Sequence, residues 1–406
     1  MVALVLAFGV VLLVSVSLSG LAARTVLSTA LLFLVAGALI GPGGLGLDTI
    51  SPRDPLVAGL ADIALFTVLF TDGQRVGLPA LKENWRLSGR ALGLGMPLGM
   101  VGIALPAHLV VGLPWSTAFL LGAVLSPTDP VFASALVGRP EVPLRLRRLL
   151  NVESGLNDGL ALPFVLIFLA TAQHETSDLG TVALELCGGL LFGIASAAAV
   201  AIAWRAKFLT AEPRMQPLGP LALAVLVYGG CHLTNANPYL AAFAAGSTLA
   251  TLDGVAAESF RPFGDLLSET TKFAALLVFG ALITPERIGH LTWQAWLLAV
   301  VAIAIVRPVA IGLSLARTSL PTPQRVTAAW FGPKGFASVV YGLLVLQSGL
   351  PESETVFDLV AVTIALSIVA HSSTDVPAAK MLGTEPPDRL PAGKESTATE
   401  GVHRRG

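Results

Sequence analysis

Long apolar runs recur along almost the whole chain, and they constrain its fold more than any other feature. A helix needs about 20 apolar residues to cross a bilayer, and about thirteen segments come near that length. They lie near residues 3–20, 25–41, 56–72, 88–113, 116–137, 149–172, 179–204, 216–234, 237–252, 268–284, 293–316, 323–347 and 355–374. Because lipid offers no hydrogen bonds to the backbone, such spans form helices. The sequence therefore predicts an all-α polytopic membrane protein with a transmembrane domain over residues 1–374.

The composition agrees with a chain whose main partner is the lipid bilayer. Of its 406 residues, 54% are hydrophobic and only 13% are charged, against about a quarter charged in soluble proteins. A formal net charge of −1 gives no basic excess for nucleic acid. Residues 375–406 are polar and rich in Pro, Gly, Ser and Thr, which is typical of a disordered tail. We expect no cofactor and no soluble regulatory domain.

Positive charges orient the predicted spans. If alternate connections are assigned to one side, most of the 25 Lys and Arg residues, Lys272 among them, fall on that side. Only Arg53 and Arg287 fall on the other side. Because cytoplasmic loops carry the excess of Lys and Arg, we expect an integral protein of the cell's plasma or inner membrane. Its N-terminus would lie outside and its C-terminus in the cytoplasm.

The odd number of spans predicts a symmetry. Spans one to six and spans eight to thirteen would form two six-helix repeats of opposite topology around a linking seventh span. Inverted repeats with broken helices near the bilayer midplane are typical of secondary transporters such as NhaA. Spans five and twelve are the matched pair that we expect to be discontinuous and to cross.

A polar cluster interrupts the sixth predicted span. Glu153 and Asn157 are one helical turn apart, as are Ser154 and Asp158. Ionisable groups within a membrane are expensive and usually functional, and carboxylate, amide and hydroxyl oxygens suit a small cation or a proton. The alternative is a polar helical turn that simply projects into a loop.

The fifth predicted span carries two prolines at its middle. Pro127 and Pro130 flank Thr128 and Asp129, and each proline removes a donor and disfavours helix in the preceding residue. We expect the chain to unwind there, which is tolerated in a membrane only beside protein or a polar cavity. The simpler interpretation is a proline kink with Asp129 as the N-cap of the second half-helix, and both can hold.

The twelfth predicted span has a similar break. Gly332, Pro333 and Gly335 surround Lys334. If this span crosses the fifth, the ammonium of Lys334 would lie near Asp129 and near the C-terminal carbonyls of a half-helix. Alternatively, Lys334 extends its side chain to the cytoplasmic surface.

Charge balance suggests how these groups pair. Arg307 lies in the middle of an apolar span and needs a carboxylate, for which Glu153 is the natural candidate. Asp158 would then be the free acid. Asp129, Glu153 and Asp158 against Arg307 and Lys334 leave one excess negative charge, which one monovalent cation or one proton neutralises.

These motifs resemble the NhaP-type branch of the monovalent cation:proton antiporters, which includes the animal sodium/hydrogen exchangers. The resemblance rests on Thr-Asp-Pro at 128–130, Asn-Asp at 157–158 and Gly-Pro-Lys-Gly at 332–335. Residues 39–47, Leu-Ile-Gly-Pro-Gly-Gly-Leu-Gly-Leu, also look like that superfamily's second span. The resemblance covers residues 25–374.

The resemblance implies a cation site. Asp158 would carry the cation or the proton, and Thr128, Asp129 and Ser154 would help to hold the cation. Asn157 would stabilise Asp129 and the crossing.

The resemblance also implies an assembly and a stoichiometry. Glu153 and Arg307 would form a structural ion pair, and the Asn-Asp dipeptide goes with electroneutral one-for-one exchange. The chain would be a homodimer with a moving core, spans near 88–172 and 293–374, and the remaining spans as dimer scaffold. One departure is Lys334, where many relatives carry arginine.

Several alternatives remain open. A K⁺/H⁺ antiporter of the same fold, a sodium-coupled symporter and a channel would all be polytopic. An intramembrane hydrolase would use Ser154 or Ser372 with a histidine, and His371 adjoins Ser372. Asp62 has no assigned role, whereas Asp72 could line an entry funnel.

Overall fold

The computed structural model describes the chain in eight stretches. These are residues 2–22, 29–47, 50–51, 54–75, 86–129, 142–173, 179–206 and 212–382. Regular structure within them is entirely helical. The helices are α1 (Val2–Ala22), α2 (Thr29–Ile40), α3 (Pro55–Arg75), α5 (Met96–Pro106), α6 (Trp115–Val124), α8 (Leu144–Ala172), α9 (Leu179–Trp204), α10 (Leu218–Thr234), α11 (Pro238–Leu252), α12 (Gly254–Leu282), α13 (Pro285–His290), α14 (Trp293–Val301), α15 (Arg307–Ser314), α16 (Thr322–Trp330), α17 (Phe336–Gln347) and α18 (Ser353–Leu382).

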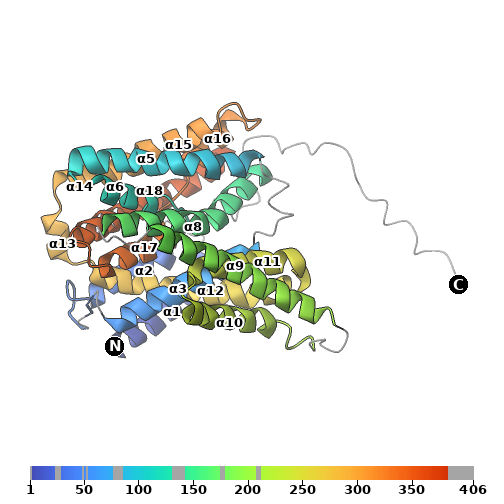
Figure 1. The fold of residues 1–406 in the computed structure, drawn as a ribbon. Helices are drawn as coiled ribbons and strands as arrows, with labels where there is room; N and C mark the ends of the chain where they lie inside the picture. Colours follow the sequence, from blue (N-terminus) through green and yellow to red (C-terminus); the bar gives the residue numbers. More distant parts are fainter. Residues whose placement is uncertain are drawn as a thin grey trace.

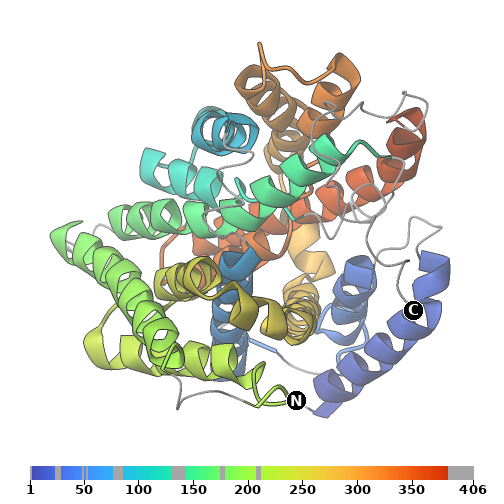
Figure 2. The same ribbon diagram turned by 90° about the vertical axis from the view of Figure 1, so that its right-hand side faces the viewer.

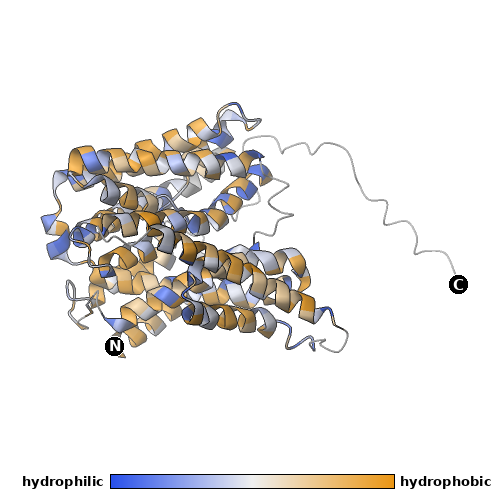
Figure 3. Cartoon of the chain, in the orientation of Figure 1, coloured by the Kyte–Doolittle hydropathy of each residue, from blue (hydrophilic) through white to orange (hydrophobic). Residues whose placement is uncertain are grey.

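Helices long and apolar enough to cross a membrane are abundant. Six are found in the described stretches, together with five shorter apolar helices. The six are Pro55–Arg75, Arg86–Val111, Leu144–Ala172, Gly180–Trp204, Trp293–Ser314 and Ser353–Thr374. Many large apolar side chains are exposed, while several charged side chains are buried. Hydrophobic residues predominate along most of the helices (Figure 3). This arrangement is what a lipid solvent requires.

The helices form two groups (Figures 1 and 2). One group, drawn in the upper part of Figure 1, contains α5, α6, α8, α14–α16 and α18. The other contains α1–α3 and α9–α12, in which α11 packs on α3 and α9, and α12 packs on α2 and α3. Helix α17 contacts both groups, since it packs on α18 and also on α3 and α12. Below, these groups are called the upper bundle and the lower bundle.

Glycines bring helix backbones of the lower bundle into direct contact. A Cβ atom on Gly73 of α3 would lie 2.4 Å from the Phe243 carbonyl of α11, and one on Gly246 of α11 would lie 2.2 Å from the Phe70 carbonyl of α3. Gly280 of α12 meets α2 in the same way. Small residues allow such close packing in lipid, where the hydrophobic effect does not drive helices together. Because the backbones of these helices touch, the lower bundle is closely packed.

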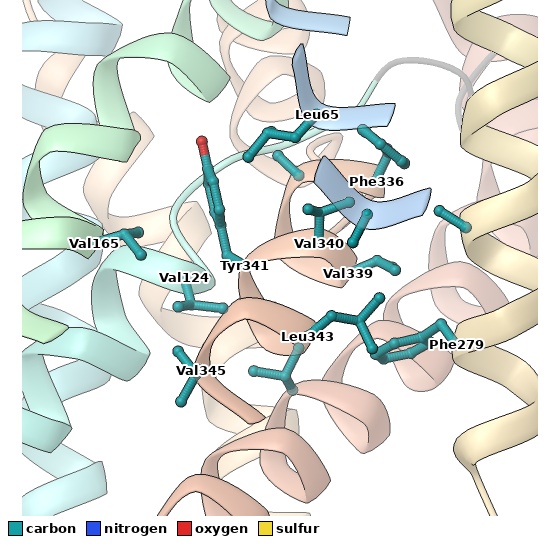
Figure 4. Close-up of a cluster of buried hydrophobic side chains, with 14 of the residues drawn as sticks. Leu65, Val124, Val165, Phe279, Phe336, Val339, Val340, Tyr341, Leu343 and Val345 are labelled. Atoms are coloured by element: carbon teal, nitrogen blue, oxygen red, sulfur yellow. The ribbon is translucent and has the colours of Figure 1, made fainter. Parts of the chain in front are cut away.

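The apolar core between the two bundles is centred on α17. Val339, Val340, Leu343 and Val345 of α17 are almost fully buried and pack among side chains of α3, α6, α8 and α12 (Figure 4). The ring of Tyr341 lies in this cluster and its hydroxyl points out of it. The broken helix is therefore anchored by its second half.

The structure tests only part of what we predicted about the ends of the helices. Helix α18 extends to Leu382, so the prediction that the chain is disordered from residue 375 was wrong for its first residues. Leu382 is buried in an apolar cluster with Leu149 and Phe331, and this contact extends the helix. The second half of predicted span five, and the tail from residue 383, lie outside the described residues.

Candidate cation-binding site

Two unwound segments cross inside the upper bundle, as the prolines and glycines predicted. Helix α6 ends at Val124, and the chain is non-helical as far as Asp129; α16 ends at Trp330, and helix resumes at Phe336. The Asp129 N–H donates to the Pro333 carbonyl at 2.9 Å. This hydrogen bond joins two segments that are 204 positions apart, and each satisfies a backbone group of the other.

Glycine is required where these segments approach their neighbours. A Cβ atom on Gly335 would lie 2.0 Å from the Cβ of Asp129, and one on Gly332 would lie 1.6 Å from Nε of Arg307. A larger residue at position 335 would displace Asp129 in the crossing, and one at position 332 would displace the guanidinium of Arg307. Gly332 and Gly335 therefore allow the side chains of Arg307 and Asp129 to lie directly against the second break.

One turn of α8 holds the first break. The Ser154 hydroxyl donates to the Thr128 carbonyl at 2.6 Å, and Asn157 Nδ2 donates to Thr128 Oγ1 at 2.7 Å. We expected Asn157 to stabilise Asp129, but its amide bonds the preceding residue. The reason is geometric, since the break turns the Thr128 side chain towards α8. Three of the predicted residues, Thr128, Ser154 and Asn157, are thus brought together.

Asp158 lies on the same turn of α8 and is 4% exposed. Its backbone carbonyl accepts a hydrogen bond from the Tyr341 hydroxyl of α17 at 2.7 Å. Its Oδ1, and also Oδ1 of Asn157, has no hydrogen-bond partner within the described part of the chain. Buried acceptors without a donor are rare because they are unfavourable, and a bound cation or proton would satisfy them. Asp158 therefore lies beside the broken helices and does not face lipid.

A lysine that we did not predict as a site residue completes the cluster. Lys272 of α12 is 8% exposed, and its Nζ lies 3.6 Å from Asp129 Oδ2 and 5.7 Å from the centroid of the Phe336 ring. We counted Lys272 among the cytoplasmic connections, and this assignment was wrong. The signal was available, since Lys272 falls within the apolar segment 268–284. The carboxylates close enough to act on it are Asp129, Asp72 and Asp158.

Lys334 lies elsewhere than predicted. Its side chain lines a cavity of about 20 Å³ together with Glu153, Asn157 and Arg307, so it belongs to the far side of the crossing. Helix α12 enters from the lower bundle and brings Lys272, not Lys334, to Asp129. Lys334 is buried, which also excludes the alternative in which it reaches the surface.

The ion pair between Glu153 and Arg307 is present. Arg307 Nη2 lies 3.0 Å from Glu153 Oε1 and also donates to the Phe331 carbonyl at 3.0 Å. A π-helical turn, Ala302–Val306, precedes Arg307, and Pro308 follows it; such turns relieve the helix where a proline lacks its donor. Arg307 thus joins α8 to the end of α16.

A chain of charges leads from the site to the surface of the lower bundle. Asp72 of α3 is buried, and Arg75 Nη1 lies 2.9 Å from its Oδ1; Arg75 Nη2 lies 2.8 Å from Asp265. Arg75, Asp265 and Glu258 line a cavity of about 250 Å³. Asp72 is therefore placed between this cavity and Lys272.

Three ion pairs account for most of the charged side chains around the crossing: Asp72 with Arg75, Asp129 with Lys272 and Glu153 with Arg307. Among the described residues, Asp158 and Lys334 are the buried charged side chains outside these pairs, and Lys334 lies on the far side of the crossing. The carboxylate of Asp158 is therefore the negative charge that a single monovalent cation or proton would neutralise.

Two other polar groups of the sequence have structural partners. Asp62 accepts a hydrogen bond from the Tyr228 hydroxyl at 2.5 Å, so it ties α3 to α10. The hydrolase alternative lacks its geometry, because Ser154 donates to Thr128 and the His371 ring nitrogens face Ser367 and Trp330.

Comparisons with known proteins agree with this architecture. Residues 9–380 match the family model described as sodium/hydrogen exchanger, transmembrane. The K(+)/H(+) antiporter NhaP of Alkalimonas amylolytica is 25% identical over 388 residues, which cover 94% of this chain and 67% of that protein. The Na(+)/H(+) antiporter of Saccharomyces cerevisiae is 25% identical over 281 residues, 62% of this chain and 28% of that protein.

A solved structure has the same fold. The sodium proton antiporter MjNhaP1 from Methanocaldococcus jannaschii superposes with a TM-score of 0.79 at 19% identity, covering 94% of this chain and 98% of that one. The predicted all-α polytopic architecture is confirmed by this likeness.

Proposed function

The chain belongs to the sodium/hydrogen exchanger family, and from that premise we propose that Asp158 carries either an alkali cation, Na⁺ in the first instance, or a proton across the membrane. The observation that supports this role is the buried Asp158 carboxylate with an unpartnered oxygen beside two crossed helix breaks. Hard oxygen ligands favour Na⁺, K⁺ or H⁺ over metals that prefer thiolates.

The cation is held by oxygens that the crossing assembles. Asp158 provides the charge, and Thr128, Asp129 and Ser154 provide further oxygens from the break and from α8. Asn157 orients Thr128 through the 2.7 Å hydrogen bond. Because this amide has no charge, it fixes the break without adding a second titrating group next to Asp158.

Exchange follows from competition at one carboxylate. Asp72 pairs with Arg75, Asp129 with Lys272 and Glu153 with Arg307, so the remaining negative charge of Asp158 is neutralised by either one cation or one proton. A neutral site crosses a low-dielectric barrier far more easily than a charged one. The empty carrier therefore does not return alone, and exchange is electroneutral and one for one.

Lys272 keeps this balance from across the bundle boundary. Its ammonium compensates Asp129, which leaves Asp158 as the group whose charge is compensated only by the transported ion. Since Lys272 belongs to the lower bundle and Asp129 to the upper bundle, their contact changes whenever the bundles move relative to each other. We place the moving core in the upper bundle and the dimer scaffold in the lower bundle. Rocking of the core then exposes the site to each side in turn.

The orientation and the assembly are part of the same proposal. The excess of Lys and Arg on one side supports a cytoplasmic C-terminus, and in this orientation the charged cavity beside Asp72 opens to the cytoplasm. The chain acts as a homodimer, and its two halves form inverted repeats.

K⁺ is the second candidate cation. The relative from Alkalimonas amylolytica is named a K(+)/H(+) antiporter, and that from Saccharomyces cerevisiae a Na(+)/H(+) antiporter. Both ions suit the same oxygen ligands. Comparison of Na⁺, K⁺ and Li⁺ gradients in proteoliposomes with an internal pH dye identifies the preferred ion.

The decisive experiment replaces the carrier carboxylate. Asp158→Asn keeps the size and removes the negative charge, so exchange should be abolished while the protein still elutes as a folded species. Glu286→Gln, at an exposed carboxylate of α13 away from this cavity, is the matched control and should exchange like the wild type. Cation-driven proton movement by Asp158→Asn would refute the assignment.

A further inference from the structure

Side chains on one face of α18 form hydrogen bonds with the second break, residues 331–335, and with the end of α16. Ser367 and His371 are one helical turn apart, and Thr374 lies three positions further along the same face. Ser367 Oγ accepts a hydrogen bond from the Lys334 N–H at 2.8 Å, and Thr374 Oγ1 accepts one from the Trp330 indole at 2.9 Å. These two acceptors bind N–H groups, whereas the last carbonyls of α16 have no donors within the helix and need a donor from another element.

His371 supplies the donor for the last residue of α16. Its Nε2 lies 3.0 Å from the Trp330 carbonyl, and a carbonyl only accepts, so Nε2 carries a hydrogen. Its Nδ1 lies 2.7 Å from the Ser367 carbonyl and 3.1 Å from the Ser367 hydroxyl.

The position of Nδ1 allows two proton states of the ring. In the neutral ring, Nδ1 accepts from the Ser367 hydroxyl, which can still accept from the Lys334 N–H. In the charged ring, Nδ1 donates to the Ser367 carbonyl instead. The same side chain can therefore exist in either state without losing its bond to Trp330.

The surroundings of the ring discriminate between these states. His371 is 1% exposed and is flanked by the rings of Trp330 and Phe331, with centroids at 5.5 and 6.1 Å. Among the side chains that the structure describes, the charged groups that face it are Arg307 of α15, which is paired with Glu153, and Lys334 in the break. A proton on Nδ1 would add a third buried positive charge to Arg307 and Lys334, which is unfavourable.

We propose that His371 is a positioning residue through which pH controls exchange from outside the cation site. The neutral ring holds the end of α16 through the bond from Nε2 to the Trp330 carbonyl. A second proton repels Lys334 and Arg307, displaces the break, and slows the carrier. This inference rests on the proposed exchange at Asp158. Protonation of His371 changes the maximal rate of exchange, whereas protonation of Asp158 changes the apparent KM.

The two protonation events have different kinetic signatures. A proton on Asp158 competes with the cation, so it raises the apparent KM, by up to about tenfold per pH unit for one proton, and saturating cation overcomes it. A proton on His371 lowers the maximal rate, and no concentration of cation restores it. Rates in proteoliposomes at saturating Na⁺ between about pH 3.5 and 8.5 separate the two.

The first variant removes the titration and keeps the donor. His371→Gln retains an N–H for the Trp330 carbonyl and cannot bind a second proton in this range. Wild-type protein should lose maximal rate towards acidic pH, and His371→Gln should lose much less, while its apparent KM still rises. Ser373→Ala, an exposed position on the same helix, is the control and should follow the wild type.

The second variant should favour the charged form of the His371 ring over the neutral form. Ser367→Ala removes the hydroxyl that partners neutral Nδ1 and leaves the carbonyl that partners the charged ring. The acidic loss of maximal rate should then begin about 0.5–1 pH unit higher, the value of one ordinary hydrogen bond.

The outcomes separate this inference from the proposed function. An acidic loss of maximal rate that is equal in wild type and His371→Gln, or unchanged in Ser367→Ala, overturns the role of His371 and leaves exchange at Asp158 intact. A wild-type protein without any exchange overturns both.

Discussion

The buried ion pair between Glu153 and Arg307 allows a quantitative test of how the upper bundle is held together. Both side chains are less than 10% exposed and their charged atoms are 3.0 Å apart. Removal of one partner from such a pair leaves an uncompensated buried charge and costs about 3–5 kcal/mol. Since about 1.4 kcal/mol is a factor of ten, Glu153→Ala should reduce the folded-to-unfolded ratio by about two to three and a half orders of magnitude.

The assay is thermal unfolding of purified protein in detergent, read by intrinsic fluorescence. Glu258→Ala is the surface control, because its pair with Arg261 is exposed and contributes about 1 kcal/mol at most. Asp129→Ala should be less destabilising than Glu153→Ala, because the carboxylates of Asp72 and Asp158 still compensate the charge of Lys272. Within the described residues, Glu153 is the carboxylate paired with Arg307.

A double variant tests the physical reason. Replacement of both partners with apolar residues, Glu153→Leu with Arg307→Met, removes the buried charges together and is expected to recover much of the stability. A Glu153→Ala protein that unfolds at the wild-type temperature, or a double variant no more stable than Glu153→Leu alone, would refute the reasoning.

Two further predictions concern the crossing. Gly335→Ala places a Cβ 2.0 Å from that of Asp129, so it should lower the unfolding temperature and abolish exchange, whereas Gly99→Ala, which meets nothing within 4 Å, should leave both unchanged; equal behaviour of the two variants would contradict the crossing. Lys272→Gln removes a positive charge beside the cation site, so the apparent KM for Na⁺ at alkaline pH should fall several-fold, whereas Lys272→Arg should keep the wild-type value; an unchanged or higher KM in Lys272→Gln would count against the role of this lysine.

The broken helices could be predicted because their causes are local. Pro127 and Pro130 remove donors from the backbone wherever they stand, and the Gly332-Pro333 pair acts in the same way in the other segment. Arg307 could likewise be matched to Glu153, because a guanidinium in lipid needs a carboxylate and few are available.

The partners of Asp129 could not be predicted in this way. Lys272 and Lys334 are both buried, and nothing in the order of residues says which ammonium faces which carboxylate. The choice depends on the rotation of α12 about its axis and on its packing against α17. The partner of Asn157 was wrongly predicted for the same reason, since a side chain on α8 can reach either of two adjacent residues in the break.

By itself the sequence determined the solvent, the helical class and the positions of the interruptions, because apolar length and missing donors act within one segment of chain. It also supplied the family resemblance through short motifs. Only the tertiary structure decided which charges meet, that α18 holds the second break through His371, and where Asp62 finds its partner. Those outcomes depend on contacts between helices far apart in the chain, and a buried charge is stabilised by its neighbours in space.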